Sequence, residues 1–217
     1  MNKLIFILPL ILTSCSSNHE WAWYVLSPDK VNGLTNLKFL LSGMGLTIYI
    51  SIISMIISII LGFIVAIPSL AKNKFLTYIN IGYVEIIRAV PLLVFILWVY
   101  YGLPIMTGIS FSPFVSGIIA LAISESAFQA EIFRAGINSI KKSQWEAGSS
   151  LGLTFYKNLR LIILPQAIKN ILPALGNQLV YVLKMSSLVS IIGIADLTRK
   201  ANELVVTTYR PLEIYTF

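Results

Sequence analysis

The stretch at residues 141–165, KKSQWEAGSSLGLTFYKNLRLIILP, is a polar hinge between two apolar halves of the chain and the only long segment that has the pattern of a cytoplasmic element. Ser143 and Glu146 have the S-x-x-E spacing of a capping box, in which each side chain bonds the backbone N–H of the other residue at a helix start. This spacing predicts a helix that begins near Gln144. Gly152 suits the left-handed position that ends a helix, so the helix should be only about two turns long.

A second helical stretch is expected next, because Phe155, Leu159 and Ile162 recur at helical spacing. Pro165 should close it, since proline cannot donate the hydrogen bond that continues a helix. The first helix should also present a smooth face to which another surface can come close. That face comprises Ala147, Gly148, Leu151 and Gly152. The simplest interpretation is a helix–turn–helix on a membrane surface, with Glu146 acting only as a cap.

The same stretch resembles the EAA loop of ABC importer permeases. It matches the pattern E-A-A, three residues, Gly, nine residues, I-x-L-P without a gap, from Glu146 to Pro165. Gly148 stands where the family usually has Ala, and Gly favours a helix less than Ala by about 1 kcal/mol, so the loop should be slightly weakened. The resemblance implies a coupling helix that sits in a groove of a separate cytoplasmic ATPase. The residues implied in this contact are Ser143, Glu146, Ala147, Gly148, Leu151, Gly152 and Pro165.

The resemblance covers about residues 36–217 and indicates one subfamily. Residues 85–93 (EIIRAVPLL), 130–137 (AEIFRAGI) and 184–188 (KMSSL) are similar to the polar amino acid permeases, which handle glutamine, glutamate, histidine and arginine. This implies an all-α, polytopic transmembrane bundle of the type I ABC importer permease kind. The implied partners are a cytoplasmic ATPase dimer, a periplasmic amino acid binding protein and a second permease subunit, identical or homologous. ATP and magnesium would be bound by the ATPase, with no cofactor in this chain.

Composition supports a membrane protein independently. The chain has 57% hydrophobic and 12% charged residues and a mean hydropathy of +0.83. A soluble domain has about 25% charged residues, so that class is excluded. The net charge of +7 then reports orientation in the membrane rather than nucleic-acid binding.

Four transmembrane helices are expected, over about residues 40–70, 84–101, 114–140 and 171–194, from largely apolar lengths that can cross a bilayer. The chain ends about where the family's fifth helix should begin, so either the sequence is a fragment or that helix is missing. Basic residues are more frequent in the stretches expected to be cytoplasmic, which places the amino terminus outside. These residues are Lys72, Lys74, Arg88, Arg134, Lys141, Lys142, Lys157, Arg160 and Lys169.

The first residues form a separate prediction. Residues 1–15 are a signal-like or lipobox segment in which Cys15 is a candidate for lipidation, with an uncleaved anchor as the alternative. Residues 16–38 should form an external segment with interfacial aromatic residues. Residues 39–217 should form the permease domain.

Two charged residues within the expected spans are candidates for the substrate pathway. Glu125 falls near mid-bilayer, where an ionised carboxylate costs several kcal/mol unless it is paired or hydrated, and Lys184 falls within the expected fourth helix. A purely structural pair between them is one hypothesis. The other is that Lys184, Ser186 and Ser187 bind a substrate carboxylate while Glu125 meets the amino group, with Gln129 as a further polar group. Two i, i+3 pairs should be structural: Glu85 with Arg88, and Glu131 with Arg134.

Two other function classes remain open. A membrane-embedded enzyme needs a nucleophile, base or metal cluster, yet the chain has only one histidine, His19, and one cysteine, Cys15. No metal site is therefore expected. A non-transporting scaffold that only binds the ATPase is the third class, and it depends on the fifth helix being absent.

Overall fold

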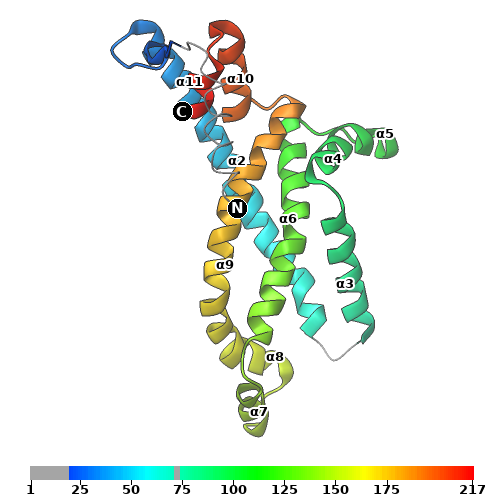
Figure 1. The fold of residues 1–217 in the computed structure, drawn as a ribbon. Coiled ribbons are helices and arrows are strands. Elements are labelled where there is room, and N and C mark those ends of the chain that lie inside the picture. The colour runs from blue at the N-terminus through cyan, green and yellow to red at the C-terminus, as the bar shows by residue number, and fades with distance from the viewer. Residues whose placement is uncertain (1–19, 71–73) are drawn as a thin grey trace, which may run out of the picture. The chain divides into compact units, whose positions relative to one another are not determined.

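The computed structural model describes residues 20–70 and 74–217, which contain helices and no strand (Figure 1). The chain divides into two compact units. Residues Leu41–Lys200 form the larger one, and the segments before and after them form the smaller one. Among the described residues, three helices are long and apolar enough to cross a membrane, or up to four if one bent pair counts as a span. An all-α membrane bundle, as predicted, is therefore confirmed.

Two spans lie close to where the sequence predicts them. Helix α2 (Val31–Leu70) ends as predicted but begins nine residues earlier, and its 40 residues make it about 60 Å long, twice the thickness of a bilayer core. Helix α6 (Pro113–Asn138) begins where the Ser112 hydroxyl accepts the Val115 N–H at 3.3 Å. This cap and the proline at the first position fix its start.

The expected span over residues 84–101 is a bent pair of helices rather than one straight helix, and its bounds differ. Helix α3 begins much earlier, and the chain bends by 94° between it and the helices that follow. Pro91 causes the break, because it lacks an N–H and disfavours helical geometry in the residue before it. The helical run also continues past the expected end, to a left-handed Gly108 (φ 73°). The elements are α3 (Lys74–Ala89), α4 (Leu92–Leu97), the π-helical turn η2 (Trp98–Gly102) and α5 (Leu103–Thr107).

Pro165 does not close a helix. It lies in the first turn of α9 (Leu164–Met185), where a missing N–H is tolerated. The π-helical turn η3 (Leu159–Ile163) precedes it, so that helical structure continues over Phe155–Ile192. The predicted apolar face of Phe155, Leu159 and Ile162 does pack against the core, and Ile163 of the π turn is fully buried beside it. The remaining elements here are α7 (Lys142–Ser150), α8 (Phe155–Asn158) and the 3₁₀ turn η4 (Ser186–Ile192).

The larger unit has two apolar cores at different levels of α6. One contains Ile118 and Leu121 of α6, packed with residues of α2, η2 and η4. The other contains Phe133 and Ile137 of α6, packed with α2, α3, η3 and α9. Between these cores, α6 buries a layer of polar residues: Ser124, Glu125, Ser126 and Gln129.

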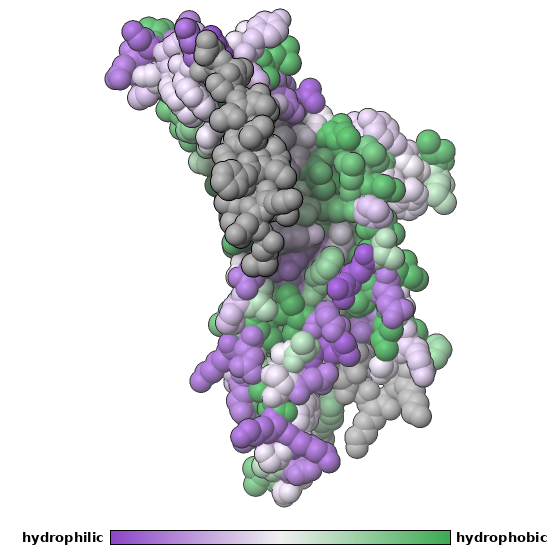
Figure 2. Space-filling model, viewed as in Figure 1, coloured by the Kyte–Doolittle hydropathy of each residue, from purple (hydrophilic) through white to green (hydrophobic). Residues whose placement is uncertain are grey.

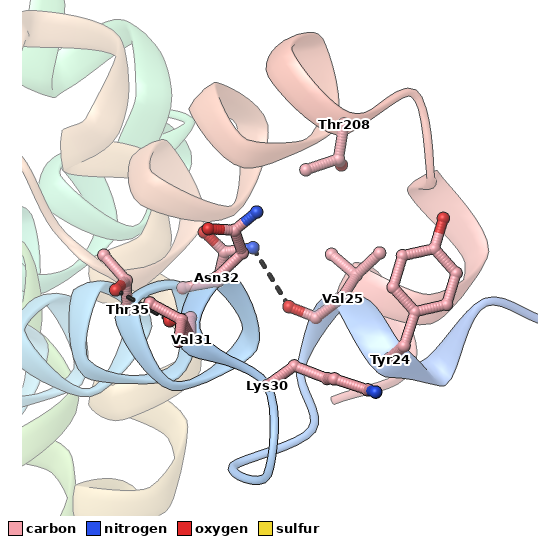
Figure 3. A pocket seen from close by; sticks show the side chains of 8 residues that line it. Tyr24, Val25, Lys30, Val31, Asn32, Thr35 and Thr208 are labelled. Carbon is pink, nitrogen blue, oxygen red and sulfur yellow. Dashed lines mark hydrogen bonds between the residues drawn. The ribbon is translucent and has the colours of Figure 1, made fainter.

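The smaller unit contains η1 (Trp23–Val25), the start of α2, most of α10 (Leu197–Thr208) and α11 (Pro211–Thr216). The buried Glu213 carboxylate accepts the Ala22 N–H at 2.7 Å and so joins the two segments. Trp21 and Trp23 stack on each other and stay exposed, as a group of interfacial aromatic residues would. A cavity of 620 Å³ opens in this unit (Figure 3). Its lining residues are Tyr24, Val25, Lys30, Val31, Asn32, Thr35, Asn36 and Thr208.

Candidate functional site

The start of α7 differs from the predicted capping box. The helix begins at Lys142, and no side chain caps it. Its first turn closes when the Gln144 N–H bonds the Lys141 carbonyl at 3.0 Å, so Ser143 already lies inside the helix. The Glu146 carboxylate instead lies 3.6 Å from the Lys142 ammonium on an exposed surface. The capping-box prediction is therefore wrong, because the helix starts too early for it.

The end of α7 is where the sequence predicts it. Gly152 is left-handed, with φ 74°. Its N–H bonds the Ser149 carbonyl at 2.9 Å, and the Leu153 N–H bonds the Gly148 carbonyl at 3.2 Å. This pair of bonds satisfies the last carbonyls of the helix and requires the left-handed residue. The helix is two and a half turns long, close to the predicted length.

The predicted smooth face is divided in two. Ala147, Leu151 and Gly152 are exposed, and Leu151 keeps 76% of its surface accessible. Gly148 is buried and faces Asn158 of α8 instead. The available contact surface of α7 is therefore apolar at Leu151, and Gly148 serves the packing of the loop itself.

Side-chain contacts hold α7 to its neighbours. The rings of Trp145 and Phe155 stack with centroids 5.6 Å apart. The Gln166 side chain of α9 donates to Gln144 at 3.2 Å. The loop and α9 therefore form one connected piece, and a groove of 860 Å³ lies beside it. Hydrophilic residues gather over α7 and α8, whereas hydrophobic residues cover α4 and α5 (Figure 2).

The partner of Glu125 is not the predicted one. Glu125 is 1% exposed, and its carboxylate accepts a hydrogen bond from the Gln178 amide of α9 at 2.5 Å. Lys184 is exposed and lies six residues farther along, about 9 Å beyond Gln178. Within this subunit the predicted Glu125–Lys184 pair is therefore wrong, because Lys184 lies beyond the level at which Gln178 meets Glu125. A pair with Lys184 of a neighbouring subunit, the other form of the prediction, stays a prediction.

Three other predicted pathway residues make separate contacts. Gln129 is buried against α2, where its amide lies 3.3 Å from the Met55 sulfur. The Ser186 and Ser187 hydroxyls each donate to a carbonyl of their own helix at 2.8 Å. None of these hydrogen bonds is to Glu125, although Gln129 shares its buried layer on α6.

Arg88 lies elsewhere than predicted. It was expected at a helix end beside Glu85, but the described residues show no ion pair between the two. Because α3 spans Lys74–Ala89, Arg88 lies in its last turn, about 21 Å from its start. Its guanidinium lies over the Phe128 ring of α6, 4.9 Å from the centroid. The predicted Glu131–Arg134 pair is confirmed, with a hydrogen bond of 2.9 Å.

These side chains meet at one groove of 210 Å³ on the surface of the subunit, between α3, α6 and α9. It offers the Arg88 cation, the Glu131 carboxylate, the Phe128 ring and the Gln178 amide, and Gln178 connects it to the buried Glu125. Opposite charges beside an aromatic ring suit a small zwitterion. Sequence reasoning missed Gln178 and Phe128, although the pair Asn177-Gln178 is a polar interruption of an apolar run and could have indicated the first.

Cys15, the lipidation candidate, and Lys72, counted for orientation, lie outside the described residues. The predictions that rest on them stay predictions.

Comparisons with known proteins agree on one family. The model for binding-protein-dependent transport system inner membrane components matches residues 58–212. The arginine transport system permease protein ArtQ of Bacillus subtilis is 36% identical over 180 residues, covering 83% of this chain and 82% of ArtQ. The glutamine transport system permease protein GlnP of Escherichia coli is 31% identical over 181 residues, covering 83% of each. A structure described as "Crystal structure of an amino acid ABC transporter with histidines" has a TM-score of 0.80 and 37% identity, covering 91% of this chain and 89% of that one.

Proposed function

Because this chain belongs to the binding-protein-dependent transport system inner membrane component family, and is a permease subunit of an ABC importer, we propose that it carries a polar amino acid along the groove that Arg88 and Gln178 line. The position of Arg88 carries the proposal. A guanidinium about 21 Å along a membrane helix is costly unless it faces a cavity or a partner. In the groove it can bind the carboxylate that every amino acid has.

The opposite charge of the substrate also finds a place. Glu131 lines the same groove, and Glu125 lies behind Gln178. An amino acid held by Arg88 through its carboxylate would direct its ammonium group towards these carboxylates. The relatives named for arginine and glutamine, and the structure described with histidines, all concern substrates with this zwitterionic end. The carboxylate and ammonium groups that these substrates share would explain why the groove binds amino acids as a class, and selection among their side chains would take place elsewhere.

The other subunits of the transporter are inferred from the family. The exposed surface of α7 at Ala147 and Leu151 would contact a cytoplasmic ATPase dimer, which would bind ATP and magnesium. A periplasmic binding protein would deliver the amino acid, and a second permease subunit, identical or homologous, would complete the pathway. The membrane would be the bacterial inner membrane, with the amino terminus outside. This chain would move between two states and perform no chemistry itself.

The test is uptake of radiolabelled arginine, glutamine or histidine by the complete importer in proteoliposomes. Arg88→Met should abolish uptake because it removes the cation, whereas Arg88→Lys should keep part of it. Glu85→Gln is the matched control, since Glu85 is an exposed charge on the same helix. Full uptake by Arg88→Met at normal protein levels would contradict the proposal.

A further inference from the structure

Gly148 of α7 lies unusually close to Asn158 of α8. A Cβ atom at Gly148 would fall 2.5 Å from the Asn158 amide nitrogen and closer still to the other two atoms of that amide. Real Cβ atoms essentially never approach a heavy atom within 3.0 Å. The Asn158 amide therefore occupies the space that an alanine methyl group would need.

Asn158 has little freedom to move away. Its side chain is 2% exposed, and its amide donates to the Trp145 carbonyl of α7 at 2.8 Å. The Trp145 ring is itself stacked on Phe155, the first residue of α8. Moving the amide would break a buried hydrogen bond and leave a donor unsatisfied. A methyl group at Gly148 would therefore push α7 away from α8 rather than displace Asn158.

The contact lies at a position that connects the loop to the groove. Asn158 is the last residue of α8 and is followed directly by η3 and α9. Leu159 and Ile163 anchor this segment in the apolar core with Ile137 of α6. The same helical stretch then reaches Gln178, whose amide holds Glu125. The angle between α7 and α8 is therefore passed on to the helix that lines the groove.

We propose that Gly148 and Asn158 are a matched pair of positioning residues that fix the angle of α7 on α8 and α9, and so set how tightly ATP hydrolysis is coupled to transport. The inference rests on the proposed function, in which α7 contacts the ATPase. It also accounts for the departure from the E-A-A pattern. Gly148 does not weaken the loop here, because Asn158 fills the space of the missing methyl group and bonds the backbone of α7.

The test is a double-mutant cycle in the reconstituted importer. Gly148→Ala should raise the ATP hydrolysed per amino acid transported severalfold at equal amounts of assembled complex. Asn158→Ala alone should raise it less, because it loses one hydrogen bond and leaves a gap. The double variant, with two methyl groups in place of Gly and Asn, should return close to the wild-type ratio. Gly82→Ala, a helical glycine with open space around it, should change nothing.

Two results would overturn the pairing: normal coupling in Gly148→Ala, or no recovery in the double variant. If Gly148→Ala fails to assemble, recovery of assembly in the double variant supports the pairing, and its absence contradicts it. A wild-type complex that transports no amino acid would contradict the proposed function instead. The melting temperatures of the four proteins would then decide the pairing, with Gly148→Ala lowered and the double variant restored.

Discussion

The coupling loop and the groove differ in how far this chain satisfies its own polar groups. In the loop, the carbonyls at the end of α7, the Asn158 amide N–H and the Trp145 ring all find partners within residues 145–158, although the buried Asn158 Oδ1 accepts no hydrogen bond. At the groove, Arg88 is exposed, with the Phe128 ring against its guanidinium and the Glu131 carboxylate lining the same groove. The loop is therefore held together by contacts among its own residues, and we expect it to move as one rigid body. The polar groups of the groove are not fully satisfied within this subunit, so a ligand or a partner subunit is needed to satisfy them.

After Arg88→Met, the largest effect is expected at the groove, from Glu125→Gln. The variant keeps the shape of the side chain and removes its charge, so the subunit should fold and assemble normally. Hydrogen bonds to charged groups are worth about 1.5–3 kcal/mol, which corresponds to a loss of about 10–100-fold in uptake. The measurement is initial uptake in proteoliposomes, with the amount of co-purified ATPase as the check on assembly.

Glu85→Gln is the control for this prediction. Glu85 is an exposed carboxylate of α3 that does not line the groove, so the loss of its charge should leave uptake unchanged. If Glu125→Gln transports at the wild-type rate, or if it fails to assemble, Glu125 is a structural group and the contrast between loop and groove is wrong at that point.

A smaller and different effect is expected in the loop from Gly152→Ala. A residue with a side chain costs about 1–2 kcal/mol in the left-handed conformation that Gly152 adopts. The helix end should loosen, so less ATPase should co-purify and the melting temperature should fall. Complexes that do assemble should bind the amino acid as the wild type does. Gly176→Ala, at an unstrained position with open space, should leave co-purification unchanged, and an equal loss there would show that the left-handed turn is not the cause.

The loop could be predicted from the sequence better than the groove. The end of α7 at Gly152 and the whole of α6 were predictable, because both are set by local signals: a left-handed glycine, and a serine cap before a proline and a long apolar run. The start of α7 was not, since the S-x-x-E spacing of Ser143 and Glu146 occurs inside the helix by chance.

The groove was harder to predict because it depends on the direction in which the helices run, which the composition of the sequence does not reveal. Hydropathy counts apolar residues but cannot show that the chain turns by 94° at Pro91. Arg88 was therefore placed at the end of a span that in fact begins at Lys74. Gln178 was missed for a related reason, because a neutral amide is a weak signal beside the charge of Lys184. Both errors concern where a residue lies along its helix, which only the packing of α3, α6 and α9 decides.

The smallest effect is expected at Asp196, a second buried carboxylate of the larger unit. Like the polar groups of the loop, it finds its hydrogen-bond partners within a few residues. It lies after the last span and accepts the backbone N–H groups of Arg199 at 3.1 Å and Thr198 at 3.4 Å, so it caps α10. Burial raises its pKa above the ordinary value of 3.8, and these hydrogen bonds offset part of the rise. The folded protein therefore holds the Asp196 proton more tightly than the unfolded chain does.

It follows that the contribution of Asp196 to the free energy of unfolding is greatest below pH 3.8 and falls as the pH rises through the folded pKa. Asp196→Asn cannot titrate, yet asparagine caps a helix about as well. The melting temperature of the wild type minus that of the variant should therefore decrease as the pH rises from 3.8 through the folded pKa, and stay constant above it. The shift should be smaller than that of Gly152→Ala, and uptake near pH 7 should not change. A strong loss of uptake in Asp196→Asn would mean that this carboxylate, like Glu125, acts on something outside the chain.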